Sequence, residues 1–562
     1  MADRRIFRFV ALNCRYTHSC LALFYVRHAL ETHLSGVEID LLPLTINDPY
    51  YQALQRILEG DPGVLLFSAY IWNASFLHRL VVDIAHIRPG WPIIIGGPQA
   101  GFLGDLPNEC TLVHGEIEGV DPSFYRDLGR GDLKPSYRAG EGADFPFPYR
   151  ADDFSTHLHK RQILYESSRG CPFSCSYCLS AVGTSLVHKN ISTVQAELEQ
   201  ILSTGPPLIK FVDRTFNDRP ERALAIWKKL VEIGDHTRFH FEVAPDRFTK
   251  EQLDFLETVP IGLFQFEIGI QSTNTKTLAA VHRQMDVERA LATIRRLRAM
   301  ENIHLHVDLI LGLPEDDWQS FGESFCRVFA CLPHHIQMGL LKVLPATPLA
   351  GEADKYGIIH CVRPPYEVLT TATMDNRTLA DLFLFGECVE RFYNNRYFPS
   401  LWRYLEQIGE NAFVFFESLL TVCRETGFFQ RAATQELMVE LLVSHVSERS
   451  DFGLLRELLI FDWLRCGHRF IPEIFQGESL AEQRTRLRKT MPLSYEPLYS
   501  ERERNRFFKQ GIFYPFSAKA LRLAGLAPEG QSAVVCFQEK QDFCLLGLCR
   551  IALLPDIDRE FT

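Results

Sequence analysis

Three cysteines lie close together in the stretch SSRGCPFSCSYCLS, at Cys171, Cys175 and Cys178. Their number is odd and their spacing is too tight for an ordinary disulfide framework, so the thiols are candidate metal ligands. A structural zinc ion takes four protein ligands, and no fourth ligand follows at the expected spacing. Three thiolates on one loop can instead bind three irons of a [4Fe–4S] cubane. Such a cluster keeps one iron open, as a catalytic cluster needs.

The composition limits the kind of protein that carries this motif. The chain has 562 residues, enough for two or three domains. Its 59 basic and 70 acidic residues give a net charge of −11, which argues against general affinity for nucleic acid or anionic membrane. No apolar run reaches the ~18 to 20 residues that span a bilayer, and the N-terminus has no signal-peptide core. We therefore expect a cytoplasmic protein with no membrane partner.

Residues 1–135 alternate short apolar stretches with helical periodicity, which predicts a doubly wound, Rossmann-like α/β domain. Such domains bind ligands at the carboxyl ends of their parallel strands. The expected helices cover 21–34, 48–60 and 75–89. The expected strands are 5–12, 37–44, 63–70, 92–97 and 110–115.

A Pro- and Gly-rich linker is expected over 136–160, followed by a second alternating region over 161–355. Right-handed crossovers would curl its six parallel strands into a partial (β/α)6 barrel. The expected barrel strands are 163–170, 208–215, 238–245, 263–270, 303–314 and 338–345. Residues 364–562 are expected to be mainly helical, with a hairpin that pairs 533–538 with 543–553.

The cysteine spacing at the head of a partial barrel, within RGCPFSCSYC, resembles the radical S-adenosylmethionine (SAM) superfamily. The resemblance implies that Cys171, Cys175 and Cys178 bind a [4Fe–4S] cluster. The amino and carboxylate groups of SAM would chelate the open iron, and reduction would yield methionine and a 5′-deoxyadenosyl radical. Tyr177 takes the family's aromatic position near the adenine.

Polar residues at the ends of later barrel strands are consistent with this resemblance. We expect Glu242 and Glu267 to be catalytic, because carboxylates inside apolar strands need partners, and the charged sulfonium and amine of SAM would provide them. A salt bridge within the barrel is the alternative. The residues expected to contact SAM are Asp213, Arg214, Thr215, Gln271, Ser272 and Gly312.

A doubly wound domain ahead of such a barrel resembles the cobalamin-binding class of radical SAM enzymes. Three loops, SAYIWN, IGGPQ and VHGEIE, follow strands and should face one edge of the sheet. The Asp-x-His-x-x-Gly motif of other cobalamin domains is absent, as it often is in this class, and a scaffold without the cofactor is the alternative. The residues expected to contact cobalamin are Tyr16, His18, Ser68, Tyr70, Asn73, Gly96, Gly97 and Gly115.

The order of the three regions resembles a branch of this class that ends in a DUF4080 domain. The resemblance implies radical methylation of an unactivated carbon, with a [4Fe–4S] cluster, SAM and cobalamin as cofactors and flavodoxin or ferredoxin as electron donor. A cobalamin-dependent cyclase or oxidase and a non-catalytic cobalamin or iron–sulfur sensor remain alternatives. An RNA methylthiotransferase would want a second cysteine set, and the acidic composition disfavours RNA.

Overall fold

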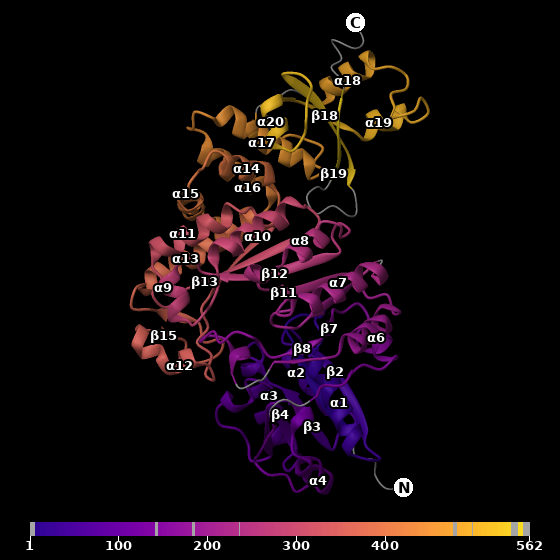
Figure 1. Ribbon diagram of the computed structural model, residues 1–562, viewed down its shortest axis with the longest axis vertical. Helices are drawn as coiled ribbons and strands as arrows, with labels where there is room; N and C mark the ends of the chain where they lie inside the picture. The colour runs from indigo at the N-terminus through magenta and orange to yellow at the C-terminus, as the bar shows by residue number, and fades with distance from the viewer. Residues whose placement is uncertain are drawn as a thin grey trace.

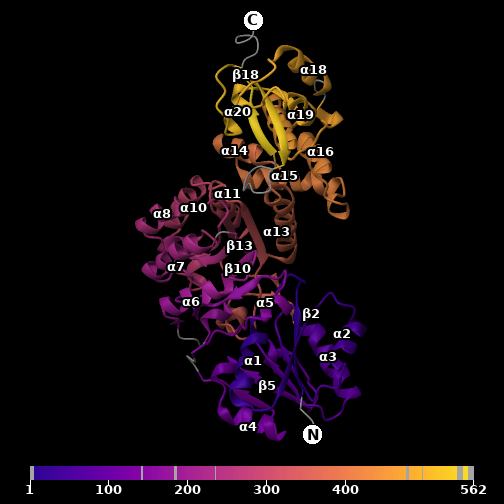
Figure 2. The same cartoon turned by 90° about the vertical axis from the view of Figure 1, so that its right-hand side faces the viewer.

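The computed structural model describes residues 6–140, 144–182, 186–234, 236–475, 480–496, 498–540 and 549–554. The molecule is elongated, with an α/β domain at one end, a barrel in the middle and a helical domain at the other end (Figures 1 and 2). The fold class expected from the sequence is confirmed. In the described ranges no helix is long and apolar enough to cross a membrane, and cytoplasmic localisation stays a prediction.

The first domain is a parallel six-stranded sheet with helices on both faces. Alternate residues of β1 enter two different cores: Phe7 and Phe9 pack with α1 and α4, whereas Val10 and Leu12 pack with α2 and α3. The strand order is β2-β1-β3-β4-β5-β6, so its direction reverses between β1 and β3, where such sheets bind ligands. The strands are β1 (Ile6–Asn13), β2 (Glu38–Thr45), β3 (Val64–Ser68), β4 (Ile93–Gly96), β5 (Cys110–His114) and β6 (Ser136–Arg138). The helices are α1 (Leu21–His33), α2 (Tyr50–Leu58), α3 (Ala74–Ile87) and α4 (Pro122–Arg130).

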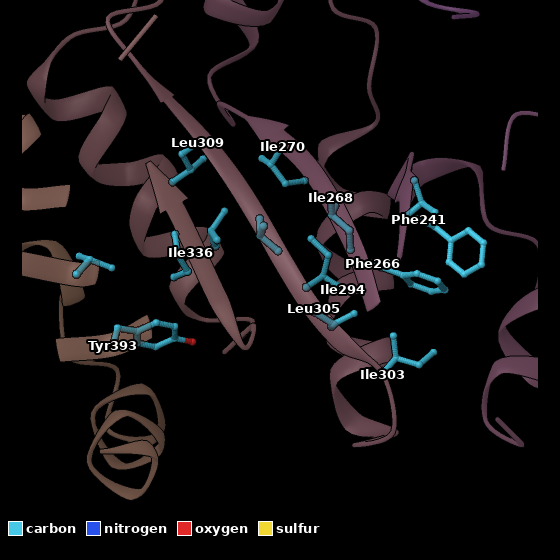
Figure 3. Close-up of a cluster of buried hydrophobic side chains, with 14 of the residues drawn as sticks. Phe241, Phe266, Ile268, Ile270, Ile294, Ile303, Leu305, Leu309, Ile336 and Tyr393 are labelled. Atoms are coloured by element: carbon cyan, nitrogen blue, oxygen red, sulfur yellow. The ribbon is translucent and has the colours of Figure 1, made fainter. Parts of the chain in front are cut away.

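The barrel is an open sheet of six parallel strands in the order β14-β13-β12-β11-β10-β7. The outward-facing residues of its strands, among them Phe241, Phe266, Ile268 and Leu305, are buried against the covering helices (Figure 3). The strands are β7 (Ile163–Tyr165), β10 (Leu208–Phe211), β11 (Arg238–Val243), β12 (Phe264–Gln271), β13 (His304–Leu311) and β14 (His335–Leu340). The helices include α6 (Ile191–Leu202), α7 (Pro220–Ile233), α8 (Lys250–Leu256), α9 (Thr275–Ala280), α10 (Val287–Ala299) and α11 (Trp318–Phe329).

Two barrel elements differ from expectation. The last strand was expected at 338–345 but runs from His335 to Leu340. The apolar residues that follow it are buried in a loop, where the backbone of Lys342 forms an isolated antiparallel β-bridge with that of Glu367. The helix that covers this strand is α13 (Asn376–Val389), where Gly386 approaches the Met338 side chain. The outer layer of the barrel is thus completed by a helix from the region expected to form the third domain.

The C-terminal region is mainly helical and ends in a small antiparallel sheet. The expected hairpin is confirmed in the pairing of β18 (Ser532–Lys540) with β19 (Cys549–Leu553), although its turn lies outside the described residues. A third strand, β17 (Ile512–Ser517), escaped prediction because it is short and contains Pro515. The helices are α14 (Pro399–Gln407), α15 (Ala412–Glu425), α16 (Gln435–Val446), α17 (Phe452–Arg465), α18 (Leu480–Thr490), α19 (Arg504–Gln510) and α20 (Ala518–Leu523).

A buried ion pair fixes the first domain to the segment that leads into the barrel. The Arg27 guanidinium on α1 donates two hydrogen bonds to the Asp153 carboxylate, at 2.6 and 2.5 Å, and both residues are at most 5% exposed. Nearby, the Gln162 backbone N–H donates to Thr17 O across 2.8 Å. Because β6 extends the first sheet to Arg138, only the part of the expected linker after Arg138 connects the first domain to the barrel.

We predict that Arg27→Met destabilises the junction by about 3–5 kcal/mol, because Asp153 would be left as an uncompensated buried charge. Thermal or urea unfolding measures the loss, and adding Asp153→Leu should restore most of it. The matched control is Arg88→Met, which breaks an exposed pair with Asp61 and should cost no more than about 1 kcal/mol. Equal losses in the two single variants would contradict the assignment.

Candidate active site at the barrel mouth

The cysteine loop follows β7 at the carboxyl end of the barrel. A short antiparallel pair, β8 (Ser168–Arg169) with β9 (Val187–His188), closes its base. Cys175 is buried, whereas Cys171 and Cys178 are half-buried. Within the described residues no group of three or more His, Cys, Asp or Glu side chains forms a single-ion metal site. A cubane distributes three thiolates over three irons, so its ligands need not converge on one point.

The surroundings of the thiols suit an anionic cluster. Burial raises the pKa of Cys171, while a backbone N–H from Phe173 and the Thr215 hydroxyl act in the opposite direction. The Thr215 Oγ1 lies 3.6 Å from the Cys171 Sγ, and the Arg283 Nη1 donates to the Cys175 Sγ at 3.7 Å. These groups would stabilise cysteine ligands in their thiolate form, so the residues present fit a [4Fe–4S] cluster.

Arg283 is a site residue that sequence reasoning missed. Its guanidinium donates to the Gly269 carbonyl as well as to Cys175, so it joins the end of β12 to the cysteine loop. Its buried Nε has no hydrogen-bond partner, and the neighbouring Gln271 Oε1 is also unpaired. Arg283 lies in the segment between α9 and α10, where no spacing pattern distinguishes it from a surface arginine.

Asp213 holds the cysteine loop rather than facing the mouth. It is fully buried, and it accepts hydrogen bonds from the Ser167 N–H at 2.9 Å and from the Ser167 and Ser168 hydroxyls at 2.6 Å each. Burial raises its pKa, although these donors favour the carboxylate. Asp213 therefore supports the cysteine loop from behind, and its expected contact with SAM stays a prediction.

Glu242 and Arg214 do face the mouth. The Arg214 Nη1 lies 3.9 Å from the Glu242 Oε1, and the Arg214 side chain is more than half exposed. Burial raises the pKa of Glu242 to about 7, because the charge of Arg214 offsets only part of the desolvation cost. Glu242 can therefore change protonation near neutral pH when a cationic ligand approaches.

The inward face of the barrel carries a set of polar side chains that we call the polar wall. Barrel interiors are usually filled by bulky branched residues, whereas one row across β11 to β14 here contains only acids and histidines. The alternation His304-x-His306-x-Asp308 was visible in the sequence and could have revealed it. The polar wall consists of Lys210, His240, Glu242, Glu267, His304, His306, Asp308 and His335.

Glu267 is the charge centre of the polar wall. Its Oε2 accepts a hydrogen bond from His240 at 2.8 Å and pairs with Lys210 at 3.3 Å. Burial opposes ionisation of Glu267, but these two partners outweigh it and lower the pKa to about 2. Glu267 thus takes part in the salt bridge considered as the alternative, and its expected catalytic role stays a prediction. A carboxylate held ionised in this way cannot serve as a proton donor near neutral pH.

Two other residues expected to contact SAM, Ser272 and Gly312, also have structural roles, and their contact with SAM stays a prediction. Ser272 is fully buried, accepts from the Asn274 N–H at 3.1 Å and lies against Ser324. A side chain at Gly312, which has a positive φ of 81°, would meet Val368 at 2.8 Å, so packing already requires a glycine there. Tyr177 is half-buried between the cysteine loop and Arg283, and burial raises its pKa.

The residues expected to contact cobalamin fall into two groups, those on the surface of their loops and those that hold the loops in place. Tyr16 is exposed with Arg161 over its ring, and Tyr70 stacks on Trp72 with ring centroids 4.3 Å apart. His18 lies near Lys210 of the barrel, and its pKa is lowered by burial and by nearby cations. These three residues lie on loops after β1 and β3, at the switch point of the sheet.

The remaining residues of that set support the loops themselves. Asn73 is buried; its Oδ1 accepts from the Tyr70 N–H, and its two amide hydrogens go to the Leu12 and Ser68 carbonyls. Ser68 lies against the Cys20 thiol at 3.5 Å. Side chains at Gly97 and Gly115 would meet Ala69 and Ala139 at under 3.0 Å, whereas one at Gly96 would meet only Val113 O at 3.8 Å.

The carboxyl ends of the two sheets face each other. Gln99, after β4, donates to the Tyr366 hydroxyl, and Arg169, after β7, pairs with Glu118, after β5, at 3.2 Å. Burial raises the pKa of Tyr70, and the nearby Arg214 guanidinium of the barrel acts in the opposite direction. A flat cofactor held by the exposed loops of the first domain would therefore lie against the barrel mouth, so the residues present fit cobalamin there.

Three family models match successive parts of the chain. They are the B12 binding domain over residues 7–120, the radical SAM superfamily over 165–325 and a protein of unknown function, DUF4080, over 354–513. The chain belongs to the cobalamin-binding radical SAM family and carries the DUF4080 domain. The cofactors that these family models imply are a [4Fe–4S] cluster, SAM and cobalamin.

The chain is similar to characterised members of this family. A 2-(S-pantetheinyl)-carbapenam-3-carboxylate methyltransferase from Streptantibioticus cattleyicolor is 25% identical over 64% of this chain and 62% of its own length. The cobalamin-dependent radical SAM methyltransferase TokK from Streptomyces tokunonensis is 25% identical over 63% of this chain and 60% of its own length. The chain thus spans about 60% of the length of these curated relatives.

Solved structures share the fold. The cobalamin-dependent SAM radical enzyme OxsB, with aqua-cobalamin bound, matches with a TM-score of 0.56 at 14% identity, over 82% of this chain and 81% of its own. The radical SAM methyltransferase TsrM from Kitasatospora setae matches with a TM-score of 0.51 at 16% identity, over 64% of this chain and 77% of its own.

We predict that Asp213→Ala lowers cluster loading several-fold. Its three donors would lose their acceptor, which costs about 1.5–3 kcal/mol for each bond to a charged group and loosens the loop base. Iron content and the visible absorbance of the anaerobically reconstituted protein measure the effect. Asp254→Ala, which removes only exposed ion pairs, is the control. Full loading of the Asp213 variant would refute the supporting role.

We also predict that Glu242 makes the ligand-free protein less stable as pH rises. Its pKa is about 7 in the folded chain against an ordinary value of 4.5, so the unfolded chain ionises first. Stability relative to Glu242→Gln should fall between about pH 4.5 and 7 and then level off, by of the order of 3 kcal/mol. Urea unfolding at several pH values tests this, with the exposed Glu251→Gln as control. Parallel pH profiles for wild type and Glu242→Gln would contradict the raised pKa.

Proposed function

We propose that this protein is a radical SAM enzyme that transfers a methyl group to an unactivated carbon of a polar substrate. The observation that carries the proposal is the opposition of the two carboxyl edges, with the cysteine loop on one side and the exposed loops of the first domain on the other. The similarity to methyltransferases, which covers about 60% of their length, supports the same chemistry.

The residues of the site have different roles according to where they lie. When bound, the cluster and SAM supply a 5′-deoxyadenosyl radical, and cobalamin supplies the methyl group. Arg283 and Thr215 stabilise the thiolates, and Asp213 holds their loop. Arg214 and Glu242 provide a cation and a titratable acid at the mouth for the charged groups of a bound ligand.

The polar wall supports a polar substrate. Several of its side chains form ion pairs with one another: Glu267 pairs with Lys210 and His240, and His306 pairs with Asp308 at 3.2 Å. The side chains of Lys210, Glu242 and Glu267 remain about a quarter to a third exposed, so they can also bind a ligand. An apolar substrate would remove water from the exposed parts of these charged side chains without offering hydrogen bonds in return, which is costly.

Anaerobic reconstitution with iron, sulfide and cobalamin tests the proposal. With SAM and a reductant, chemical or reduced flavodoxin or ferredoxin, we expect 5′-deoxyadenosine from the wild type and none from Cys171→Ala, Cys175→Ala or Cys178→Ala. The control is Cys361→Ala, which removes a free, half-buried thiol outside the loop and should retain activity. Formation of S-adenosylhomocysteine during turnover would report remethylation of the cobalamin.

The same assay separates the other functions. A cobalamin-dependent cyclase or oxidase would form 5′-deoxyadenosine without S-adenosylhomocysteine and without a methylated product. A sensor would bind the cofactors and form neither compound. Either result would overturn the proposed methyl transfer, and the second would also overturn radical catalysis.

A further inference from the structure

A small pocket lies at the opposite end of the barrel from the cysteine loop. It is bounded by the end of α10, the segment that enters β14 and the start of α14, so it joins the barrel to the C-terminal domain. One of its lining residues is Tyr393, which is labelled in Figure 3. The Tyr393 hydroxyl donates to the carbonyl of Pro333, just before β14. The pocket is lined by Arg298, Leu332, Pro333, His334, Tyr393, Arg396, Pro399, Trp402 and Arg403.

Two buried side chains of this pocket carry hydrogen-bond donors with no acceptor. His334 is 4% exposed, and its Nδ1 accepts from the Leu305 N–H at 3.0 Å, so the proton of the neutral ring is on Nε2. That Nε2 has no partner, and neither has the Nε1 of Trp402, which is 3% exposed. Burial, together with the charge of Arg298, lowers the pKa of His334 to about 2, which keeps the ring neutral. Unpaired buried donors are rare and require an acceptor.

The charged groups around the pocket are mostly cations. Arg298 and Arg403 approach from different helices, and each is tied to a backbone carbonyl, of Leu332 and Leu523, through one nitrogen. The acid that contacts them is Glu301, at 3.5 Å from Arg298 and 4.0 Å from Arg403, and it is not part of the lining. With Arg396, three guanidinium groups therefore line one small space.

We propose that this pocket binds a phosphate group, at a site separate from the barrel mouth. Its volume of about 50 Å³ has room for a few water-sized groups, since each needs about 10–15 Å³ by the same measure. Guanidinium groups match phosphate oxygens in geometry and charge. Donors that enter from α10, from the segment before β14 and from α14 suit a tetrahedral oxyanion, which accepts hydrogen bonds in several directions, better than a planar carboxylate.

Titration of the purified full chain with inorganic phosphate tests this site without any cofactor chemistry. Binding is followed by calorimetry and by thermal stabilisation at constant ionic strength, with chloride and acetate as comparison anions. We expect saturable binding to the wild type that is weakened roughly tenfold or more by Arg298→Gln and by Trp402→Phe, each of which removes hydrogen-bond donors. Glycerol 3-phosphate in a parallel titration shows whether the site takes a free phosphate or a phosphomonoester.

Two control variants make the result specific. Arg295→Gln changes an exposed arginine one turn earlier on α10, and Trp318→Phe changes a tryptophan that packs on Phe413 away from the pocket. Both should bind phosphate as the wild type does. Trp402→Phe keeps the aromatic ring that stacks on Phe416, so it preserves a test if Arg298→Gln fails to fold. No saturable binding, equal binding to all variants, or equal affinity for acetate would overturn the proposal.

Discussion

Arg169 stands where the two α/β bodies meet, and its ion pairs explain why they meet in one orientation. Its guanidinium pairs with Glu166 of its own loop at 2.7 Å and with Glu118 of the first domain at 3.2 Å, while Glu116 lies 4.0 Å away. Tyr25 on α1 donates to the same Glu166 at 3.0 Å. Because Arg169 immediately precedes the cysteine loop, this network fixes the loop and the first domain together.

The consequence is a site whose two sides come from different sheets. The carboxyl ends of the first sheet contribute loops that are held by their own buried hydrogen bonds, such as those of Asn73. The barrel contributes a loop supported from behind by Asp213. Because other residues support the loops, Tyr70, Arg214 and Glu242 can face the space between the sheets. Catalysis by large cofactors requires positioning of this kind more than it requires reactive side chains.

The sequence predicted most strands of both sheets because buried parallel strands are short, apolar and regularly separated by helices. It placed β6 in the linker, and it began the last barrel strand three residues late. The sequence does not show whether a polar residue or a glycine at a strand end contacts a ligand or supports the protein's own chain. Ser272, Gly97 and Gly312 support their own chain, and only the folded neighbours reveal this. Arg283 is joined to Cys175 across 108 residues of sequence, a distance that no local pattern encodes. The polar wall was readable from period-two alternation, whereas the donors around His334 depend on a tautomer set by tertiary contact.

We infer that the cluster and cobalamin are held face to face across the space between the two sheets. Both the reduced cluster and cob(II)alamin are paramagnetic, so electron paramagnetic resonance of the doubly loaded protein measures their separation. We expect spectra altered by magnetic coupling between the two centres, with the coupling reduced when Arg169 is replaced by methionine. A spectrum equal to the sum of the two singly loaded samples would contradict it.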